Sequence, residues 1–386
     1  MKIAIMMRAM DQDSGFRAYV MGLVENMLQI DESNSYLLLY RTTKWTGHFS
    51  SYKNVKEILL QAAHKFIWDQ VAVPYRAWQE GADIIFNPKF SVPLISHCPV
   101  AMGLQEPAWW VWPKHYERFD VLYQKIMLPL YCRKSAHLFP MAKFNLEETR
   151  KCIGLPLNNA TVTYTVPGKQ MRPMEDRAEL ENFRRKYQLP DRYILSVTRV
   201  DHPGLDKFEK GGSFHPGKNP ETTLRAFIQC RKDLPHKLVF AGRRIRDYML
   251  HLGFKDADFE DVIFIPFVPY EELPELYNNA DLFVVASYYD GCSTVIMEAM
   301  ACGCPVVASA TGGFPEISGG AAIHADPHDP ADFSRKFKLV LLDEKLRKEL
   351  KKNSLERASF FNWQRTAKLT LEGLDRAVRK RIGNSK

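Results

Sequence analysis

Short apolar runs alternate with amphipathic segments along most of this chain, and this alternation limits its possible folds more than any other feature. Residues 16–30, for example, carry apolar side chains at helical spacing. Strands that alternate with helices form βαβ units and assemble into parallel sheets, so we predict an α/β fold. The expected strands are 3–7, 36–40, 83–86, 99–103, 137–140 and 161–166, then 193–200, 237–241, 262–266, 281–286 and 305–309.

The alternation pauses once, over residues 167–192, where two prolines and a glycine precede a highly charged segment. Such residues mark loops, and we expect an interdomain linker over 169–192. The 386 residues also exceed the usual ~150-residue domain, which favours two domains. We therefore predict an N-terminal domain over 1–168 and a C-terminal domain over 193–365, each a Rossmann-like, doubly wound parallel sheet.

Composition excludes several classes of protein. Hydrophobic residues make up 46% and charged residues 25% of the chain, which is ordinary for a globular protein. The net charge of +8 is spread over both halves, which argues against nucleic acid as a partner and favours polyanionic small ligands or an anionic membrane surface. The seven cysteines include no C-x-x-C pair, and the eleven histidines have no metal-binding spacing. We expect a reducing compartment and no metal site.

Neither a membrane span nor a signal peptide is expected. The longest uncharged stretches, 90–105 and 299–315, fall short of the ~20 residues of a membrane-spanning helix. Residues 2–8 are too short for the apolar core of a signal peptide and are typical of a first strand. We expect a cytoplasmic protein that is either free in solution or peripheral at the inner face of the cell membrane.

Two glycine patterns come close to nucleotide-binding motifs. A dinucleotide site needs G-x-G-x-x-G after the first strand, but only Gly15 is present there, which argues against a dehydrogenase. Residues 212–219 nearly match a phosphate-binding P-loop, but Asn219 replaces the magnesium-binding hydroxyl and Pro220 follows it. We reject kinase and NTPase chemistry. Lys218, just before a predicted helix, can still meet a phosphate or can be an ordinary solvated lysine.

The densest signal surrounds Asp290 and Glu298, which are eight residues apart. The sequence predicts a helix that is capped by Ser293 or Thr294 and ends near Cys302. Its first N–H groups would point at a ligand over the carboxyl end of the sheet, with one carboxylate before the helix and one inside it. A capping arrangement with a buried, paired Glu298 is the alternative.

This segment resembles the retaining glycosyltransferases of family 4, also called group 1, which use nucleotide sugars. Their motif is Glu, seven residues, Glu, then A-M-A-x-G-x-P-V-V-A-S and Gly-Gly-x-x-Glu, and residues 298–309 and 312–316 match its second part. The family pattern G-R…K-N-x-x-x-x-L-x-x-A-F resembles residues 198–199 and 218–227. The resemblance is strong over 193–316 and implies the GT-B fold, in which two Rossmann-like domains face each other across a cleft.

The resemblance implies an enzyme that moves a sugar from a nucleoside-diphosphate donor to a hydroxyl of a sugar or lipid-linked acceptor. Transfer would retain the anomeric configuration, by departure and attack on the same face, and would need no metal or other cofactor. The expected setting is assembly of a cell-surface polysaccharide or glycolipid. A C-terminal helix at about 366–386 is expected to pack back on the N-terminal domain.

Roles for individual residues follow from the same resemblance. Arg199 and Lys218 would stabilise the leaving diphosphate, Asp290 would face the sugar, and Glu298 would accept hydrogen bonds from the ribose hydroxyls. The other donor-binding residues would be Gly15, Gly291, Cys292, Ser293 and Thr294.

Three positions depart from the family pattern, and two other functions stay open beside transfer. Asp290 replaces the first Glu of the motif, Thr198 replaces the glycine before the arginine, and Met102 stands where members often carry a histidine. A catalytically idle GT-B protein that acts as a binding or scaffold subunit is one alternative. A nucleotide-sugar 2-epimerase on the same fold is the other, and turnover of donors with a panel of acceptors would separate the three.

A cluster of tryptophans provides the expected acceptor side. Trp109, Trp110 and Trp112 precede basic residues and a tyrosine, and packing in the first-domain core is one interpretation. Three such side chains cannot all point inward from one extended strand, so at least one is expected at the acceptor or at a membrane interface. The candidate acceptor-side residues are Met102, Gln105, Trp110 and Trp112.

Overall fold

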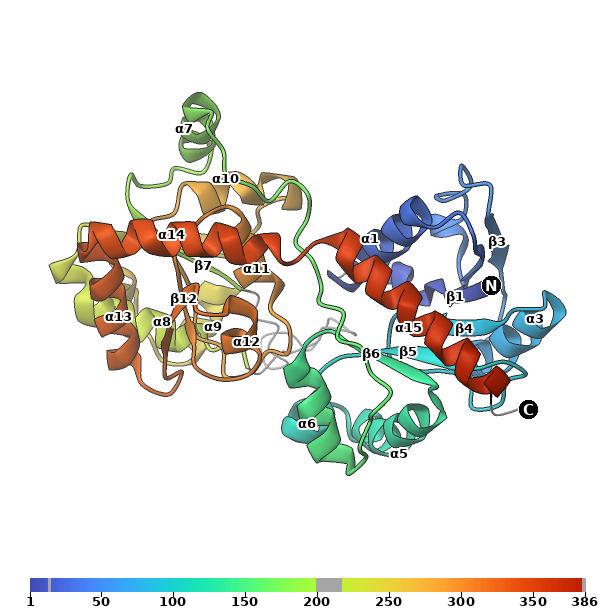
Figure 1. Ribbon diagram of the computed structural model, residues 1–386. Coiled ribbons are helices and arrows are strands. Elements are labelled where there is room, and N and C mark those ends of the chain that lie inside the picture. The colour runs from blue at the N-terminus through green and yellow to red at the C-terminus, as the bar shows by residue number, and fades with distance from the viewer. Residues whose placement is uncertain (13–14, 199–216, 384–386) are drawn as a thin grey trace. The chain divides into compact units, whose positions relative to one another are not determined.

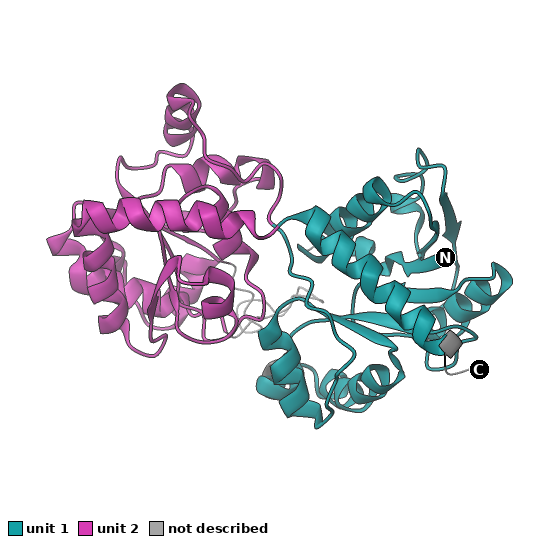
Figure 2. Ribbon diagram, in the orientation of Figure 1, with its two compact units in different colours: residues 1–166, 362–386 teal, residues 167–361 magenta. Residues whose placement is uncertain are grey.

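The computed structural model describes residues 1–12, 15–198 and 217–383, and these form two compact units. Unit 1 combines residues 1–166 with 362–386, and unit 2 contains residues 167–361 (Figure 2). Each unit holds a six-stranded parallel sheet (Figure 1). The prediction of an α/β protein with two Rossmann-like sheets is confirmed.

The sheet of unit 1 has the strand order β3-β2-β1-β4-β5-β6. Its strands are β1 (Lys2–Met6), β2 (Ser35–Tyr40), β3 (Val55–Leu59), β4 (Ile84–Asn87), β5 (Val100–Leu104) and β6 (His137–Pro140). Its α-helices are α1 (Gly15–Ile30), α2 (Lys65–Ile67), α3 (Val73–Gln79), α4 (Ala108–Val111), α5 (Arg118–Lys134), α6 (Lys143–Ile153) and α15 (Trp363–Gly383). Shorter turns are η1 (Met7–Asp11), η2 (Thr43–Trp45), η3 (Trp68–Ala72, a π-helix) and η4 (Pro113–His115).

Both faces of this sheet are covered, because successive side chains of a strand point to opposite sides. Ala4 and Met6 face a core that α3, α5 and α6 complete. The other face lies under α1 and α15, which run side by side (Figure 1). Close contact there requires glycine, since a Cβ at Gly22 would overlap the Trp363 ring.

The sheet of unit 2 has the strand order β12-β11-β10-β7-β8-β9. Its strands are β7 (Tyr193–Val197), β8 (Lys237–Ala241), β9 (Val262–Ile265), β10 (Leu282–Val285), β11 (Val306–Ser309) and β12 (Ala322–Ala325). Its α-helices are α7 (Arg177–Lys186), α8 (Pro220–Cys230), α9 (Ile245–His251), α10 (Leu273–Asn278), α11 (Thr294–Ala301), α12 (Phe314–Ser318), α13 (Pro330–Leu342) and α14 (Glu344–Ser359). Shorter turns are η5 (Arg231–Asp233), η6 (Asp256–Phe259) and η7 (Tyr270–Glu272).

Helices α8, α9 and α13 bury one face of this sheet, where Phe227, Phe240 and Phe337 share a core. Helices α10 and α11 cover the other face, where the Tyr277 and Phe283 rings meet edge to face at 5.5 Å. In each unit the first strand lies inside the sheet, and the winding direction reverses between β1 and β4 or between β7 and β10. Open α/β sheets bind ligands at the carboxyl ends of the strands at such a reversal.

Three details differ from the sequence-based expectation. Residues 161–166 form no strand; only an isolated bridge joins Leu138 and Ala160 next to β6. The edge strands β3 and β12 were not predicted, because they are short and partly exposed. The expected linker 169–192 belongs to unit 2, where Met174 N donates to Asn278 Oδ1 at 2.9 Å.

Helix α15 belongs to unit 1, where Thr366 Oγ1 donates to the Tyr164 carbonyl oxygen at 3.0 Å. Arg376 on the same helix donates to Thr161 Oγ1 at 2.8 Å. These bonds tie the end of the chain to the segment that follows β6. Among the described residues, no helix combines the length and the apolar character needed to cross a bilayer.

Candidate functional site

The candidate site lies in unit 2 at the carboxyl ends of β7, β10 and β11. Three segments meet there: residues 217–219 before α8, residues 286–293 after β10, and residues 310–313 after β11. The reversal between β7 and β10 places these segments where a doubly wound sheet binds its ligand.

Backbone contacts fix these segments against one another. Tyr288 N donates to the Gly217 carbonyl oxygen at 2.6 Å, and Gly313 N donates to the Asp290 carbonyl oxygen at 2.9 Å. A Cβ at Gly313 would overlap the Gly291 carbonyl oxygen. The glycine therefore allows the close approach that holds the Asp290–Gly291 turn in place.

Lys218 and Asp290 form an ion pair in this site, with Nζ and Oδ2 2.8 Å apart. Their side chains are 26% and 14% exposed, so both charges are partly shielded yet accessible. Asn219, the N-cap of α8, adopts the left-handed conformation, accepts from Thr222 N and donates to the Ala286 carbonyl oxygen at 2.8 Å. These bonds fasten the backbone next to Lys218 to the end of β10.

Helix α11 begins beside this pair and points its N-terminus into the site. Ser293 is the N-cap residue, as expected, but its side chain makes no capping bond. Its buried Oγ has no hydrogen-bond partner among the described residues. Gly291 is buried and Cys292 and Thr294 are partly buried in the same turn. A helix N-terminus with an available hydroxyl suits an anion such as a diphosphate.

Glu298 lies on α11 and is buried, with 6% of its surface exposed. Tyr277 Oη donates to Glu298 Oε2 at 3.0 Å, and Tyr270 also bonds the carboxyl group. Burial raises the pKa of Glu298 to about 7, although both tyrosine bonds favour the charged form. The structure thus places Glu298 in a buried polar cluster, which matches the buried, paired glutamate of the alternative interpretation but not its capping bond.

The structure brings together the predicted residues Lys218, Asp290 and Ser293, whereas Glu298 turns toward the tyrosines of η7 and α10. Arg199, the other predicted diphosphate partner, lies outside the described residues. Within the described part of the chain, no group of three His, Cys, Asp or Glu side chains is placed to hold a metal ion.

The predicted residues of unit 1 occupy several environments. Gly15 begins α1, and a Cβ built there would meet no atom within 4 Å. Met102 is fully buried in β5, and its sulfur accepts from Ser91 N at 3.4 Å. The expectation that Met102 faces an acceptor is therefore wrong in this structure, since its side chain packs in the core. Gln105 follows β5, and its amide donates to Met141 Sδ at 3.9 Å.

The tryptophan segment forms the short helix α4 and the turn η4, not an extended strand. The argument from alternating side chains therefore does not apply to it. Trp109 and Trp110 pack against the unit 1 core, and the Trp109 ring meets the Phe90 ring edge to face at 5.3 Å. Trp112 is partly buried after α4.

Sequence reasoning missed three residues of the unit 2 site: Asn219 as a helix cap, and Tyr270 and Tyr277 as partners of Glu298. No local pattern marks the tyrosines, because Tyr270 lies in the turn η7 and Tyr277 in the helix α10.

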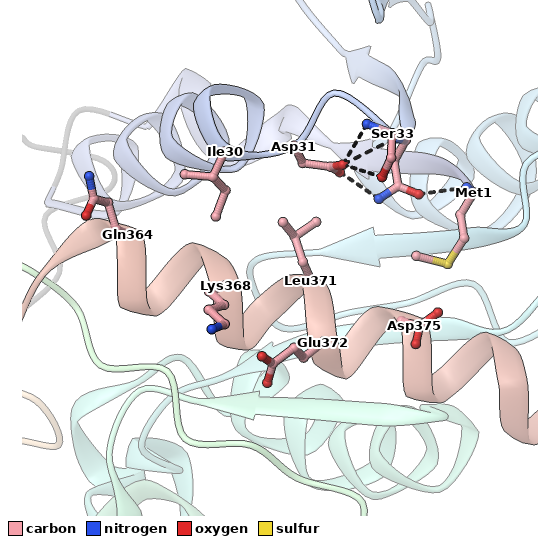
Figure 3. Close-up of a pocket in the computed structure, with 10 residues that line it drawn as sticks. Met1, Ile30, Asp31, Ser33, Gln364, Lys368, Leu371, Glu372 and Asp375 are labelled. Carbon is pink, nitrogen blue, oxygen red and sulfur yellow. Dashed lines mark hydrogen bonds between the residues drawn. The ribbon is translucent and has the colours of Figure 1, made fainter.

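A pocket of about 880 Å³ in unit 1 is a less suitable site (Figure 3). Ile30 and Asp31 line one side, and Lys368 and Leu371 of α15 line the other. The Asp31 carboxylate accepts several hydrogen bonds within its own turn. The pocket also includes Met1 and so lies near the amino ends of the strands, away from the edge where such sheets bind ligands.

Comparison with solved structures shows that the fold is GT-B. HepE from Anabaena in complex with UDP superposes with a TM-score of 0.71 at 16% identity, over 97% of this chain and 100% of that one. WaaG, described as a glycosyltransferase involved in lipopolysaccharide biosynthesis, superposes with a TM-score of 0.65 at 13% identity, over 95% and 97% of the two chains.

Sequence comparison finds similarity to known glycosyltransferases. Residues 210–357, less than half of the chain, match the model of the glycosyl transferases group 1. The serotype-specific mannosyltransferase WbdA of Escherichia coli is 28% identical over 218 residues, which are 55% of this chain and 25% of that protein. A D-inositol 3-phosphate glycosyltransferase of Salinispora arenicola is 39% identical over 241 residues, 49% of this chain and 52% of that one. The chain spans about a quarter to a half of the length of these relatives.

Proposed function

We propose that this protein transfers a sugar from a nucleoside-diphosphate donor to a hydroxyl acceptor during assembly of a cell-surface polysaccharide or glycolipid. The observation that carries the proposal is the Lys218–Asp290 pair at the strand reversal of unit 2, inside the matched segment. The donor class is supported by HepE structures that contain UDP or UDP-glucose. The role in polysaccharide assembly is supported by the names of two relatives, a serotype-specific mannosyltransferase and an O-antigen chain mannosyltransferase.

The proposed mechanism begins with binding of the diphosphate against Lys218 and the N-terminus of α11. Lys218 Nζ is 2.8 Å from Asp290 and is partly exposed, so a phosphate oxygen can compete for it. Exchange of this partner frees the Asp290 carboxylate to face the sugar. Charge-assisted contacts of this kind are worth about 1.5–3 kcal/mol each, and they act as the leaving group gains charge.

The finer features of the reaction are part of the proposal. Arg199 is assigned to the same diphosphate through the family pattern. With two basic side chains and a helix N-terminus at the leaving group, the reaction needs no divalent cation. Transfer proceeds with retention, by departure and attack on one face, so neither Asp290 nor Glu298 acts as a covalent nucleophile.

We assign Glu298 to the ribose hydroxyls of the donor. In the structure it accepts from Tyr270 and Tyr277, and a carboxylate has further lone pairs with which to accept from ribose hydroxyls. A purely structural Glu298 would instead only hold α11 against η7 and α10. Calorimetry on a glutamine variant separates these two roles.

Peripheral contact with an anionic membrane is proposed for unit 1 and suits a lipid-linked acceptor. Phe119, Leu122 and Ile126 form an exposed apolar stripe on α5, with Arg118 and Lys125 beside it. An apolar stripe with basic flanks is typical of helices that lie at a lipid surface. Co-sedimentation with anionic vesicles, but not with neutral ones, is expected, and it should be lost in an Ile126→Ser variant. Equal recovery with both kinds of vesicle would refute this contact.

Incubation with a panel of nucleotide sugars and acceptors, followed by mass spectrometry, tests the activity. A product heavier than the acceptor by one sugar residue supports transfer. An isomerised donor would instead indicate an epimerase. Donor binding without any product would indicate an idle binding subunit.

A further inference from the structure

A second cluster of charged residues lies in unit 1, where the winding of its sheet reverses between β1 and β4. Arg8 follows β1, Lys89 and Ser91 follow β4, and Asp69 comes from η3. The side chains of Arg8 and Ser91 both bond Asp69 although the three residues are far apart in sequence, and Lys89 lies close enough to feel the charge of Arg8. This is the ligand-binding edge of a doubly wound sheet.

Asp69 and Arg8 form a two-point ion pair. Arg8 Nε and one terminal nitrogen each lie 3.2 Å from an Asp69 oxygen. The Asp69 side chain is only 5% exposed, and Ser91 Oγ donates to it at 3.1 Å. Burial raises the pKa of Asp69, while Arg8 and Ser91 oppose this effect. The carboxylate is thus satisfied within the cluster, and the Arg8 side chain keeps an exposed part.

The charge of Lys89, unlike that of Arg8, is not balanced by a carboxylate among the described residues. Its Nζ donates to the neutral Gln12 side chain and lies 5.0 Å from the centre of the Phe16 ring. Among the described residues, no carboxylate lies within ion-pair distance of it. Burial, with Arg8 and Lys65 nearby, lowers the pKa of Lys89 to about 8. In the described part of the chain, three cations therefore surround the Asp69 carboxylate, and an additional anion would relieve this imbalance.

The loop that carries Lys89 is held in an unusual conformation. Ser91 has a φ of 124°, which residues other than glycine rarely adopt. Asn87 Nδ2 donates to the Ser91 carbonyl oxygen at 2.7 Å, which helps to hold this backbone. Strain of this kind persists where the surroundings enforce it and is frequent at ligand sites.

We propose that Arg8 and Lys89 bind an anionic oxygen group, a phosphate or a carboxylate, carried by the acceptor. This inference rests on the proposed glycosyltransferase function and specifies its acceptor class. The anion would contact Lys89 Nζ and the exposed part of the Arg8 guanidinium, while Asp69 keeps Arg8 in position. Paired basic side chains of these two types suit oxyanions, since arginine offers a planar fork and lysine a point charge.

Lysine labelling tests the site without any turnover. The full chain is acetylated briefly at pH 8 with rising inorganic phosphate, and mass spectrometry follows each lysine. Bound phosphate should raise the pKa of Lys89, and a rise of one unit from about 8 would slow its labelling about fivefold. Lys53 is exposed and serves as the internal control. Equal rates at Lys89 with and without phosphate, or equal slowing at Lys53, would overturn the proposal.

Two variants separate this site from the diphosphate site of unit 2. Phosphate should still protect Lys89 from acetylation in the Lys218→Ala variant. In the Lys65→Gln variant the same protection should require more phosphate, because Lys65 is an exposed cation near Lys89. Loss of protection in Lys218→Ala would assign the anion to the donor and overturn the proposal. Protection without sugar transfer would refute the proposed function but leave the anion site intact.

Acceptor kinetics provide the second test once a donor is known. Lys89→Gln should raise the KM for an acceptor that carries a phosphate or carboxylate at least tenfold, and leave the KM for its uncharged analogue unchanged. Lys53→Gln is the matched control. Equal KM values for the two acceptors in the Lys89→Gln variant would refute the assignment of acceptor class, even if transfer itself is demonstrated.

Discussion

Replacement of Glu298 by glutamine should make the stability of the protein less dependent on pH. Burial raises the pKa of this carboxyl group from an ordinary value of 4.5 to about 7. The folded protein therefore binds its proton more tightly than the unfolded chain does. The stabilising contribution of the protonated form is fully present below pH 4.5 and is lost as the pH rises through 7.

The magnitude follows from the two pKa values. A rise from 4.5 to about 7 corresponds to a free energy on the order of 3 kcal/mol. Glutamine has nearly the same shape, cannot ionise, and still offers an oxygen to Tyr277 and Tyr270. Relative to the glutamine variant, the wild type should lose stability on that order between pH 4.5 and pH 8.

Urea unfolding of both proteins at pH 4.5, 6 and 8 measures this difference. Glu271→Gln is the matched control, because Glu271 is exposed on the neighbouring turn. If the free energies of unfolding of wild type and Glu298→Gln change by the same amount from pH 4.5 to pH 8, the buried-carboxyl argument is refuted. Calorimetry with a nucleoside diphosphate on the same samples tests the ribose role. That role predicts affinity weaker by about 1–2 kcal/mol, and unchanged affinity would remove Glu298 from the donor site.

Three further predictions concern the donor site. Lys218→Ala and Arg199→Ala should each lower turnover by a factor of roughly 100 or more with little change in melting temperature, and near-full activity in either variant would contradict the assignment. Turnover should survive EDTA, and a strict need for added magnesium or manganese would count against a metal-independent reaction. Gly313→Ala should lower both the melting temperature and the donor affinity, because its Cβ would overlap the Gly291 carbonyl oxygen; unchanged values would show that this turn can move.

The central architecture could be predicted because the interior strands are continuous apolar runs. Strands such as β1 and β10 are buried on both faces and stand out in the sequence. The edge strand β3 could not be found this way, since exposed Lys56 and partly exposed Glu57 interrupt it. Pairing with β2 stabilises β3, although the sequence of β3 alone does not predict a strand.

The site was predictable in part for a similar reason. Lys218 and Asp290 lie 72 residues apart, in two motifs that each precede a predicted helix, and the family resemblance placed both in one site. The tyrosine partners of Glu298 depend on the packing of α10 against α11, which local pattern does not reveal. The Arg8–Lys89 cluster depends on pairing between β1 and β4, two strands that are not consecutive in the chain. No local motif marks it.

The central claim is that Lys218 helps to hold the diphosphate of the donor, and calorimetry with UDP and other nucleoside diphosphates tests it most directly. Lys218→Ala should weaken binding roughly tenfold to a hundredfold, the effect of losing one charge-assisted contact. Lys232→Ala is the matched control, because Lys232 is exposed elsewhere in unit 2, and it should leave the affinity unchanged. If a nucleoside diphosphate binds Lys218→Ala as tightly as it binds the wild type, the donor site has been placed wrongly.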